Sequence, residues 1–250
     1  MACNTPTEKA ATTSEKSAAP STEAPAAKPS KKKPKKASFE KLTYKNAAQQ
    51  LKALAQEHPE TMVEISTEYG NITLRLFEET PLHRTNFIRL VKAGYYDQTQ
   101  FYRVVKEFMI QGGNSDDLEI QSVKGKLGIY QIPAEFNPKF YHRRGAVAMA
   151  RVRENNPKKK SAPYSFYIVQ GKKYTPGELR GVEETYELKF NAEQTEVYTT
   201  VGGAPYLDYD HTVFGEVVEG MDVVDKIAEV ETDKREWPLQ LIHTKMKVLR

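Results

Sequence analysis

The chain has 250 residues and a mass of 28.4 kDa, and 39% of its residues are hydrophobic, so it can form one large domain or two small ones. It has one cysteine, which excludes an internal disulfide and a thiolate zinc cluster, and no apolar run approaches the ~18 residues of a membrane span. The five histidines are scattered and form no HExxH pair, and phosphate-loop and dinucleotide-binding glycine motifs do not occur, so we expect neither a metal ion nor a cofactor.

The positive charge is concentrated at the N-terminus. Residues 1–38 contain eight lysines and three glutamates, a net charge of +5, whereas the whole chain carries +4. Residues 39–250 therefore have a net charge of −1. A globular nucleic-acid-binding protein usually carries its positive charge on the folded domain, so we expect no nucleic acid as a partner.

Residues 1–38 contain no aromatic residue and consist mostly of Ala, Thr, Ser, Pro, Glu and Lys. Such a composition buries too little apolar surface to offset the entropy of ordering, which predicts a disordered basic tether. The lysine-rich run Lys31–Lys36 has three interpretations. It is a solvated, self-repelling linker, a contact for an anionic lipid or polymer, or a nuclear address.

The start of the chain, Met-Ala-Cys-Asn, resembles a bacterial lipoprotein cut just before its cysteine, with a start methionine in place of the lost signal peptide. A tether rich in small and charged residues follows, as a lipid-anchored domain requires. We therefore expect membrane anchoring through a lipidated Cys3 in the native form, in the bacterial cell envelope facing the periplasm. The alternatives are an incidental exposed thiol and a cytoplasmic location.

The first predicted elements are a helix and a hairpin. Apolar residues recur at helical spacing over Phe39–His58, and Pro59 ends this predicted helix. Apolar and polar residues alternate in Met62–Thr67 and again in Asn71–Phe77, with a glycine-containing turn between them. This pattern predicts a β-hairpin.

A second helix is predicted to begin at Thr80-Pro81, with the threonine as N-cap and the proline at the first helical position, and to end at Gly94. A short amphipathic helix is predicted at Met221–Ile227. Further strands are predicted at Phe101–Val105, Phe108–Gln111, Ala146–Ala150, Phe166–Gln170, Val213–Val217 and Lys245–Val248.

Many short strands with two flanking helices favour a mainly β fold with a closed antiparallel sheet. We divide the chain into the tether 1–38, a helical extension 39–58 and a domain 59–250. Residues 171–203 interrupt the strand rhythm, and Asn191 to Gln194 reads as a capping box before Gly202-Gly203. We interpret 171–203 as a helical insertion; the alternative is a long disordered loop.

The stretch Phe101–Asn114 carries the chemistry. Arg103 lies among apolar strand residues, so it faces either water or the edge of a pocket. Phe108 and Met109 add apolar surface, and Gln111 adds a neutral donor and acceptor. This combination suits an uncharged, amide-containing ligand and lacks a nucleophile or an acid/base pair. On these residues alone, an ordinary strand with a surface arginine stays open.

The same stretch, FYRVVKEFMIQGGN, closely resembles the signature of the cyclophilin-type peptidyl-prolyl cis-trans isomerases. Similar family segments follow in order over about 62–249, apart from 171–203: Thr80–Phe87, Gly145–Ala150, Phe166–Ile168, Leu207–Gly215 and Val218–Met221. The resemblance implies a closed eight-stranded antiparallel barrel capped by two helices, with the site on one outer face.

By this resemblance Arg103 is the catalytic residue and Arg151 contributes backbone contacts to the peptide. Other residues implied in substrate binding are Phe108, Met109, Tyr167 and Leu207 in the proline pocket, Gln111 and His211 for polar or edge contacts, and Ala150 at the border of the groove. The sequence departs from the family at Ser165, where glutamine is usual, and at Tyr206, where tryptophan is frequent.

Three functions follow from the sequence. The first is a monomeric prolyl isomerase that acts on proline-containing polypeptides during folding of envelope proteins, with the arginine stabilising the twisted imide. The second is a weakly active or inactive cyclophilin-like module that binds proline-containing segments, which Ser165 and the insertion motivate. The third, a nucleic-acid-associated protein acting through the basic tail, is the least favoured because the domain is near neutral.

Overall fold

The computed structural model describes residues 39–117 and 119–250. The predicted tether 1–38, the run Lys31–Lys36 and Cys3 therefore lie outside the described residues. In the part that is described, no helix combines the length and apolar character needed to cross a membrane.

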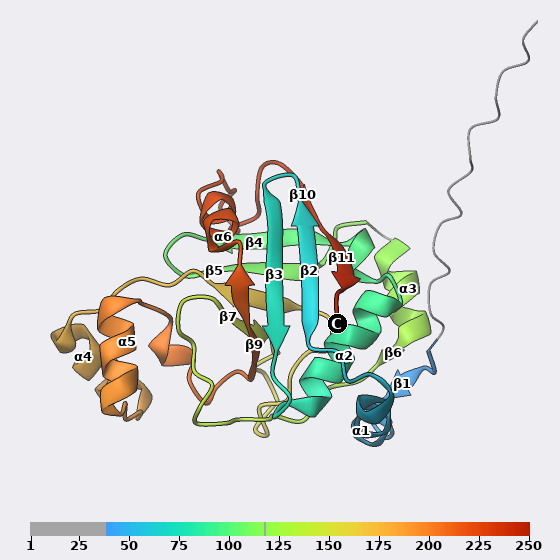
Figure 1. Ribbon diagram of the computed structural model, residues 1–250, viewed down its shortest axis with the longest axis horizontal. Helices are drawn as coiled ribbons and strands as arrows, with labels where there is room; N and C mark the ends of the chain where they lie inside the picture. The colour runs from blue at the N-terminus through green and yellow to red at the C-terminus, as the bar shows by residue number, and fades with distance from the viewer. Residues whose placement is uncertain (1–38, 118) are drawn as a thin grey trace, which may run out of the picture. The chain divides into compact units, whose positions relative to one another are not determined.

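Nine strands form one antiparallel sheet (Figure 1). They are β2 (Met62–Thr67), β3 (Gly70–Leu76), β4 (Gln100–Val105), β5 (Met109–Asn114), β7 (Ala146–Met149), β8 (Phe166–Val169), β9 (Val213–Glu219), β10 (Ile242–His243) and β11 (Lys245–Val248). The strand order is β10-β4-β5-β8-β7-β9-β3-β2-β11. The sheet is nearly closed, because β10 and β11, at its two edges, are separated along the chain by Thr244 alone.

This arrangement confirms the predicted mainly β, barrel-like fold. If β10 and β11 are counted as one interrupted strand, the sheet has the eight positions that were expected. The predicted hairpin is β2 and β3, paired from Met62 opposite Arg75 to Thr67 opposite Gly70. Gly113 makes a close approach possible, because its φ is +91° and a Cβ there would lie 2.1 Å from the carbonyl oxygen of Tyr164.

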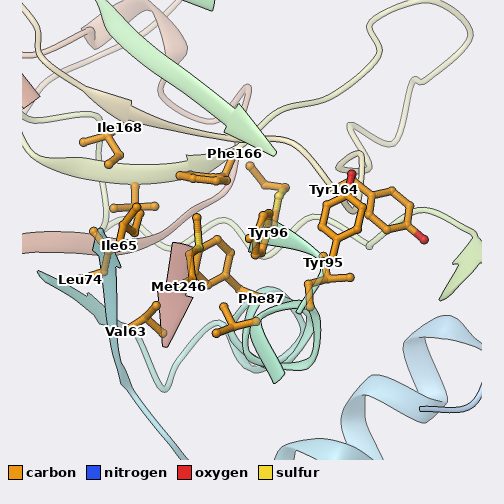
Figure 2. Close-up of a cluster of buried hydrophobic side chains, with 14 of the residues drawn as sticks. Val63, Ile65, Leu74, Phe87, Tyr95, Tyr96, Tyr164, Phe166, Ile168 and Met246 are labelled. Atoms are coloured by element: carbon orange, nitrogen blue, oxygen red, sulfur yellow. The ribbon is translucent and has the colours of Figure 1, made fainter. Parts of the chain in front are cut away.

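Both faces of the central strands are buried, and alternate residues point to opposite sides. On β8, Phe166 and Ile168 face the main core, while Tyr167 and Val169 belong to a second apolar cluster on the other face. Figure 2 shows part of the main core, in which Phe166 lies between Ile168 and the aromatic rings that pack on the barrel. The period of two residues therefore places Tyr167 outside the barrel, where a site can form.

Helix α2 (Pro81–Lys92) packs on the sheet with Phe87 fully buried. Thr80 holds the predicted N-cap position, but its side chain makes no capping bond; it donates to the carbonyl oxygen of Phe77 instead. The carboxylate of Glu135 accepts from the backbone N–H groups of Leu82 and His83, at 3.0 and 2.9 Å. A distant acidic side chain thus satisfies the helix N-terminus, which also favours negative charge.

The N-terminal extension differs from the predicted single helix over Phe39–His58. Helix α1 covers only Ala47–Glu57, and β1 (Leu42–Thr43) pairs in parallel with β6 (Gly128–Ile129). The Asn46 side chain accepts from the backbone N–H of Thr43 at 2.7 Å, which holds this stretch in a turn. The extension is joined to α2 by the buried Arg89, whose guanidinium donates to the carbonyl oxygen of Glu40 at 2.9 Å.

The insertion is helical, as predicted, and not a disordered loop. It contains α4 (Pro176–Tyr186) and α5 (Ala192–Thr200), which lie together beside the sheet in Figure 1. Asn191 and Gln194 form the predicted capping box at the start of α5. The predicted short amphipathic helix is α6 (Met221–Ala228), and a helix that the sequence did not indicate, α3 (Glu119–Leu127), precedes β6.

Candidate active site

One row of side-chain positions crosses four strands of the barrel. Arg103 on β4 is opposite Gln111 on β5, Gln111 is opposite Tyr167 on β8, and Tyr167 is opposite Ala148 on β7. A register shift between Phe101 and Arg103 leaves an extra residue on β4. Such a bulge re-aims side chains, and here it aligns the arginine with the outer face.

A cavity of about 400 Å³ lies over this row. Ten of the eleven site residues predicted from the sequence line it: Arg103, Phe108, Met109, Gln111, Ala150, Arg151, Tyr167, Tyr206, Leu207 and His211. Arg153 also lines the cavity and was not predicted. Ser165, the remaining predicted residue, does not line it. The cavity is of a size for a small ligand or a side-chain ring with its neighbours.

The floor of the cavity is apolar and closely packed. Met109, Tyr167 and Leu207 are all at most 4% exposed and belong to the outer apolar cluster. Phe108 and Tyr206 are partly buried against this cluster, with ring centroids 5.7 Å apart. A buried apolar floor with aromatic walls binds an apolar ring by removing its surface from water.

Arg103 is the cation beside this floor. Its Nε donates to the carboxylate of Glu236 at 2.6 Å, and its Cζ lies 6.0 Å from the ring centroid of Phe108. The two ion-paired side chains are 38% and 43% exposed. The bond from Nε–H to Glu236 fixes the orientation of the guanidinium plane. The terminal NH2 groups of Arg103 stay available to donate hydrogen bonds in the cavity that it lines.

The loop that carries Glu236 is itself constrained. Glu236 has a φ of 65°, in the left-handed region that non-glycine residues seldom adopt. Its carbonyl oxygen accepts from the backbone N–H of Val104 at 2.8 Å, and its own N–H donates to the carbonyl oxygen of Asp233 at 2.9 Å. The Asp233 carboxylate accepts from the N–H of Trp237, which lowers the pKa of Asp233. These bonds hold Glu236 beside β4.

Ser165 and Gln111 both form hydrogen bonds with Tyr102, which was not among the predicted site residues. The Gln111 amide donates to the hydroxyl of Tyr102, and Tyr102 packs against Trp237 with ring centroids 5.6 Å apart. Burial raises the pKa of Tyr102, while hydrogen bonds from Ser165 and Gln111 oppose that rise. Ser165 therefore acts on the cavity through Tyr102 and the amide, although it does not line the cavity.

A buried polar chain supports the floor from below. The hydroxyl of Tyr167 lies 3.0 Å from Nε2 of His142, whose Nδ1 lies 2.8 Å from Asp208. The other carboxylate oxygen of Asp208 accepts from the hydroxyl of Tyr198, on α5, at 2.6 Å. Because buried polar groups are costly without partners, this chain fixes Tyr167 and ties the insertion to the site.

His211 is neutral at physiological pH. Burial, and then the proximity of His142, lower its pKa to about 4, although its bond to Met149 acts in the opposite direction. Its Nδ1 lies 3.2 Å from the carbonyl oxygen of Met149, so Nδ1 carries the proton and donates. The ring of His211 packs edge-on against that of Tyr167, with centroids 5.6 Å apart.

The described residues contain no group of three His, Cys, Asp or Glu side chains that could hold a metal ion. What the site offers is a planar cation, an apolar floor and neutral hydrogen-bonding groups. The residues that sequence reasoning missed, chiefly Glu236, Tyr102 and Arg153, carry no local motif. The only indication for Tyr102 was its place beside Arg103 in the strand.

Comparisons with known proteins agree with this geometry. Residues 62–248 match the family model of the "Cyclophilin type peptidyl-prolyl cis-trans isomerase/CLD". A Streptococcus pyogenes protein, provisionally named a bifunctional phosphatase/peptidyl-prolyl cis-trans isomerase, is 37% identical over 73% of this chain, which spans only 37% of that relative. A Staphylococcus aureus protein, provisionally named a peptidyl-prolyl cis-trans isomerase, is 31% identical over 72% of this chain and 87% of its own length.

The fold also matches solved structures. A Cryptosporidium parvum cyclophilin superposes with a TM-score of 0.53 at 23% identity, over 76% of this chain and 99% of that chain. The strand order of the barrel, the outward-facing row on β4, β5, β8 and β7, and the family match over residues 62–248 lead to one conclusion. The chain belongs to the cyclophilin-type peptidyl-prolyl cis-trans isomerase family.

Proposed function

We propose that this protein accelerates the cis-trans rotation of X-Pro bonds in polypeptides, with Arg103 as the catalytic residue. One observation carries the proposal: the guanidinium of Arg103 and the apolar floor formed by Met109, Tyr167 and Leu207 line the same cavity. The C. parvum cyclophilin was crystallised in the presence of the dipeptide Ala-Pro, and we carry a proline-containing ligand over to this cavity.

The chemistry requires no nucleophile. Rotation about an amide bond has a barrier of ~18–20 kcal/mol because resonance makes the bond partly double. The two isomers of an X-Pro bond are nearly balanced, so a catalyst has only to lower this barrier. When the bond is twisted, the proline nitrogen loses conjugation and gains a lone pair. A guanidinium that donates to this nitrogen binds the twisted state better than either planar state.

Each part of the site has a role in this scheme. The apolar floor holds the proline ring and excludes water, which strengthens the interaction between Arg103 and the nitrogen. Glu236 fixes the guanidinium, since it accepts from Nε–H and leaves the terminal N–H groups for the substrate. Gln111, held by Tyr102, supplies an amide for the peptide backbone. His211 is neutral and adds the edge of its ring.

The decisive experiment is Arg103→Ala in an isomerase assay with an Ala-Pro-Phe peptide. We expect kcat/KM to fall by about 100-fold or more, because removal of one transition-state donor costs ~2.7–4 kcal/mol. Arg75→Ala is the matched control. Arg75 also lies on a barrel strand and pairs with a glutamate, Glu216, but outside this cavity, and Glu216 keeps Arg143 as a partner. Activity in Arg103→Ala equal to that of the control would refute the proposal.

The second candidate is a module that binds proline-containing segments with little turnover. The ion pair between Arg103 and Glu236 motivates it, because the carboxylate offsets part of the positive charge that the mechanism uses. Peptide titration followed by NMR separates the two functions: saturable binding without faster cis-trans exchange favours the module. Anchoring through Cys3, a periplasmic location and a role in envelope protein folding stay predictions, as does the monomeric state.

A further inference from the structure

A second cavity of about 580 Å³ adjoins the proline cavity. The two share Arg151, Arg153 and Tyr206 in their walls, so one continues into the other. We call the second cavity the cationic trough; its other walls include Lys159, Tyr186 and Glu187. A polypeptide bound at its proline has to run over the adjacent surface, and three extended residues span only about 10 Å. The trough is therefore within reach of residues close to the proline.

The insertion builds one wall of the trough. Helix α4 ends at Tyr186, and Glu187 after it adopts the left-handed conformation, with a φ of 54°. The ring of Tyr186 packs against that of Tyr206 with centroids 5.8 Å apart. Leu179 is buried inside the insertion and anchors α4. The trough thus depends on a segment that interrupts the family signature in the sequence.

Cations outnumber the carboxylate that they surround. Asp210 lies 2.5 Å from Arg151, 3.4 Å from Lys159 and 3.5 Å from Arg153. Burial acts to raise the pKa of Asp210, but the hydrogen bond and charge of Arg151, with the charge of Lys159, hold it below its usual range. One ionised carboxylate therefore faces three positive charges. Glu187 and Asp208 add two further carboxylates, so the lining holds three cations and three carboxylates. Because Asp208 is buried, the exposed part of the wall presents Arg153 and Lys159 against Glu187.

The three cations do not play the same part. Arg151 is almost fully buried and directly bonded to Asp210, so it belongs to the framework. Arg153 and Lys159 are 69% and 43% exposed, and their distances to Asp210 exceed a normal N–H···O bond. Arg153 can rotate towards an incoming carboxylate. The Lys159 ammonium donates to the carbonyl oxygen of Tyr209 at 2.9 Å and keeps further N–H donors for a ligand. Asp208, which also borders the trough, is already bonded to His142 and Tyr198.

We propose that the cationic trough is a specificity subsite that selects client segments carrying Asp or Glu within about three residues of the proline. The inference rests on the proposed isomerase function, because it describes how the same substrate continues beyond the proline cavity. Arg153 and Lys159 receive the acidic side chain, and Tyr186 and Tyr206 provide aromatic surface beside it. The insertion 171–203 then acts as a selector of clients.

The test uses proline peptides that differ only in one residue, Glu, Gln or Lys, placed two positions before or two positions after the proline. Cis-trans exchange is measured by NMR at low salt. We expect KM to be about 1.4- to 5-fold lower for the Glu peptide than for the Gln peptide in one of the two placements, and highest for Lys, since exposed charge pairs contribute ~0.2–1 kcal/mol. High salt should reduce the differences.

Variants assign the preference to the trough. Lys159 borders the trough and not the proline cavity. Lys159→Glu should therefore reverse the order of the Glu and Lys peptides while the kcat for the Gln peptide is retained. Lys158→Gln is the matched control, because this neighbouring exposed lysine borders neither cavity. Equal KM values for all peptides, or an order that Lys159→Glu leaves unchanged, would overturn the inference.

The experiment separates this inference from the proposed function. If the wild-type protein exchanges no peptide, the isomerase proposal fails, and the trough is then judged by peptide titration alone. An affinity order of Glu over Gln over Lys, with amide shifts at Tyr186 and Lys159, supports the trough in that case. Equal affinities overturn it. Circular dichroism and a melting curve verify that Lys159→Glu is folded.

Discussion

The ion pair between Arg103 and Glu236 gives the sharpest prediction for catalysis. The carboxylate has two opposing effects. It orients the guanidinium through the 2.6 Å bond to Nε, and it offsets part of the charge that stabilises the twisted imide. A series of substitutions at Glu236 separates these effects, because glutamine keeps an acceptor without charge, whereas alanine removes both.

The exposure of the Arg103–Glu236 ion pair determines how much it contributes to stability. More than a third of each side chain is exposed, so the pair adds only ~0.2–1 kcal/mol to stability, and every variant should fold. Freeing an arginine releases up to ~2 kcal/mol of rotamer entropy that has to be lost again at each turnover. We therefore expect Glu236→Ala to lower kcat by about 3- to 30-fold with little change in KM, because the orientation matters in the transition state.

Glu236→Gln is expected to retain kcat or to raise it slightly. The amide oxygen still accepts from Nε–H, and the opposing negative charge is gone. Alanine and glutamine meet the same left-handed backbone at this position, so strain does not distinguish them. Glycine would relieve the backbone strain at this position as well as remove the carboxylate, so Glu236→Gly is an unsuitable variant.

The assay is NMR exchange on an Ala-Pro-Phe peptide, together with the ¹⁵N signal of the Arg103 side chain. In the wild-type protein the Nε–H of Arg103 should exchange slowly with water, and in Glu236→Ala quickly. Glu229→Ala is the control: Glu229 forms an exposed 2.8 Å pair with Lys106 and borders no catalytic group. Wild-type kcat together with rapid Nε–H exchange in Glu236→Ala would show that orientation by Glu236 is irrelevant.

Three further outcomes follow from the structure. The pKa of His211 is lowered to about 4 in the folded protein, against about 6.5 when unfolded, so the unfolded state binds more protons between these values. Stability should fall by ~3 kcal/mol as the pH drops from 6.5 to 4, and the difference in unfolding free energy between wild type and His211→Asn, from urea titrations, should change with pH only in this interval. Tyr198→Phe leaves the buried Asp208 with one partner fewer and should lower the unfolding free energy by ~1–3 kcal/mol, measured by urea titration. Gly113→Ala should cost more than ~3 kcal/mol, because a Cβ would meet the carbonyl oxygen of Tyr164 at 2.1 Å with φ at +91°; a melting point within a few degrees of wild type would contradict this.

The elements that the sequence predicted well are those that short-range periodicity controls. The hairpin of β2 and β3 follows from alternation and a glycine turn, and α5 follows from the capping box at Asn191. The extension was predicted less well, because Asn46 and Thr43 form a local turn that competes with the helix. At Thr80 the position was right, but the capping group comes from Glu135, 53 residues beyond Leu82.

At the site, too, residues that are close in the sequence were predicted and residues that are distant in the sequence were not. Arg103 and Gln111 become neighbours through a tight strand pair, so a local motif contains both. Glu236 lies 133 positions after Arg103, and its place depends on a turn with a positive φ and a backbone bond to Val104. Neither feature has a sequence signal that would connect the two residues. The trough depends likewise on how α4 meets Tyr206.

Deleting the insertion cannot test its role in client selection, because the insertion supports the buried polar chain beneath the cavity floor. Tyr198, on α5, donates to Asp208, which holds His142 against the hydroxyl of Tyr167. Removing 171–203 would expose this chain and leave Asp208 with one partner fewer, at a cost of ~1–3 kcal/mol for each group left unpaired. Lost activity would then report a damaged floor and not a lost specificity subsite. Lys159→Glu changes no residue of the buried polar chain. This substitution can therefore separate client selection from the integrity of the site.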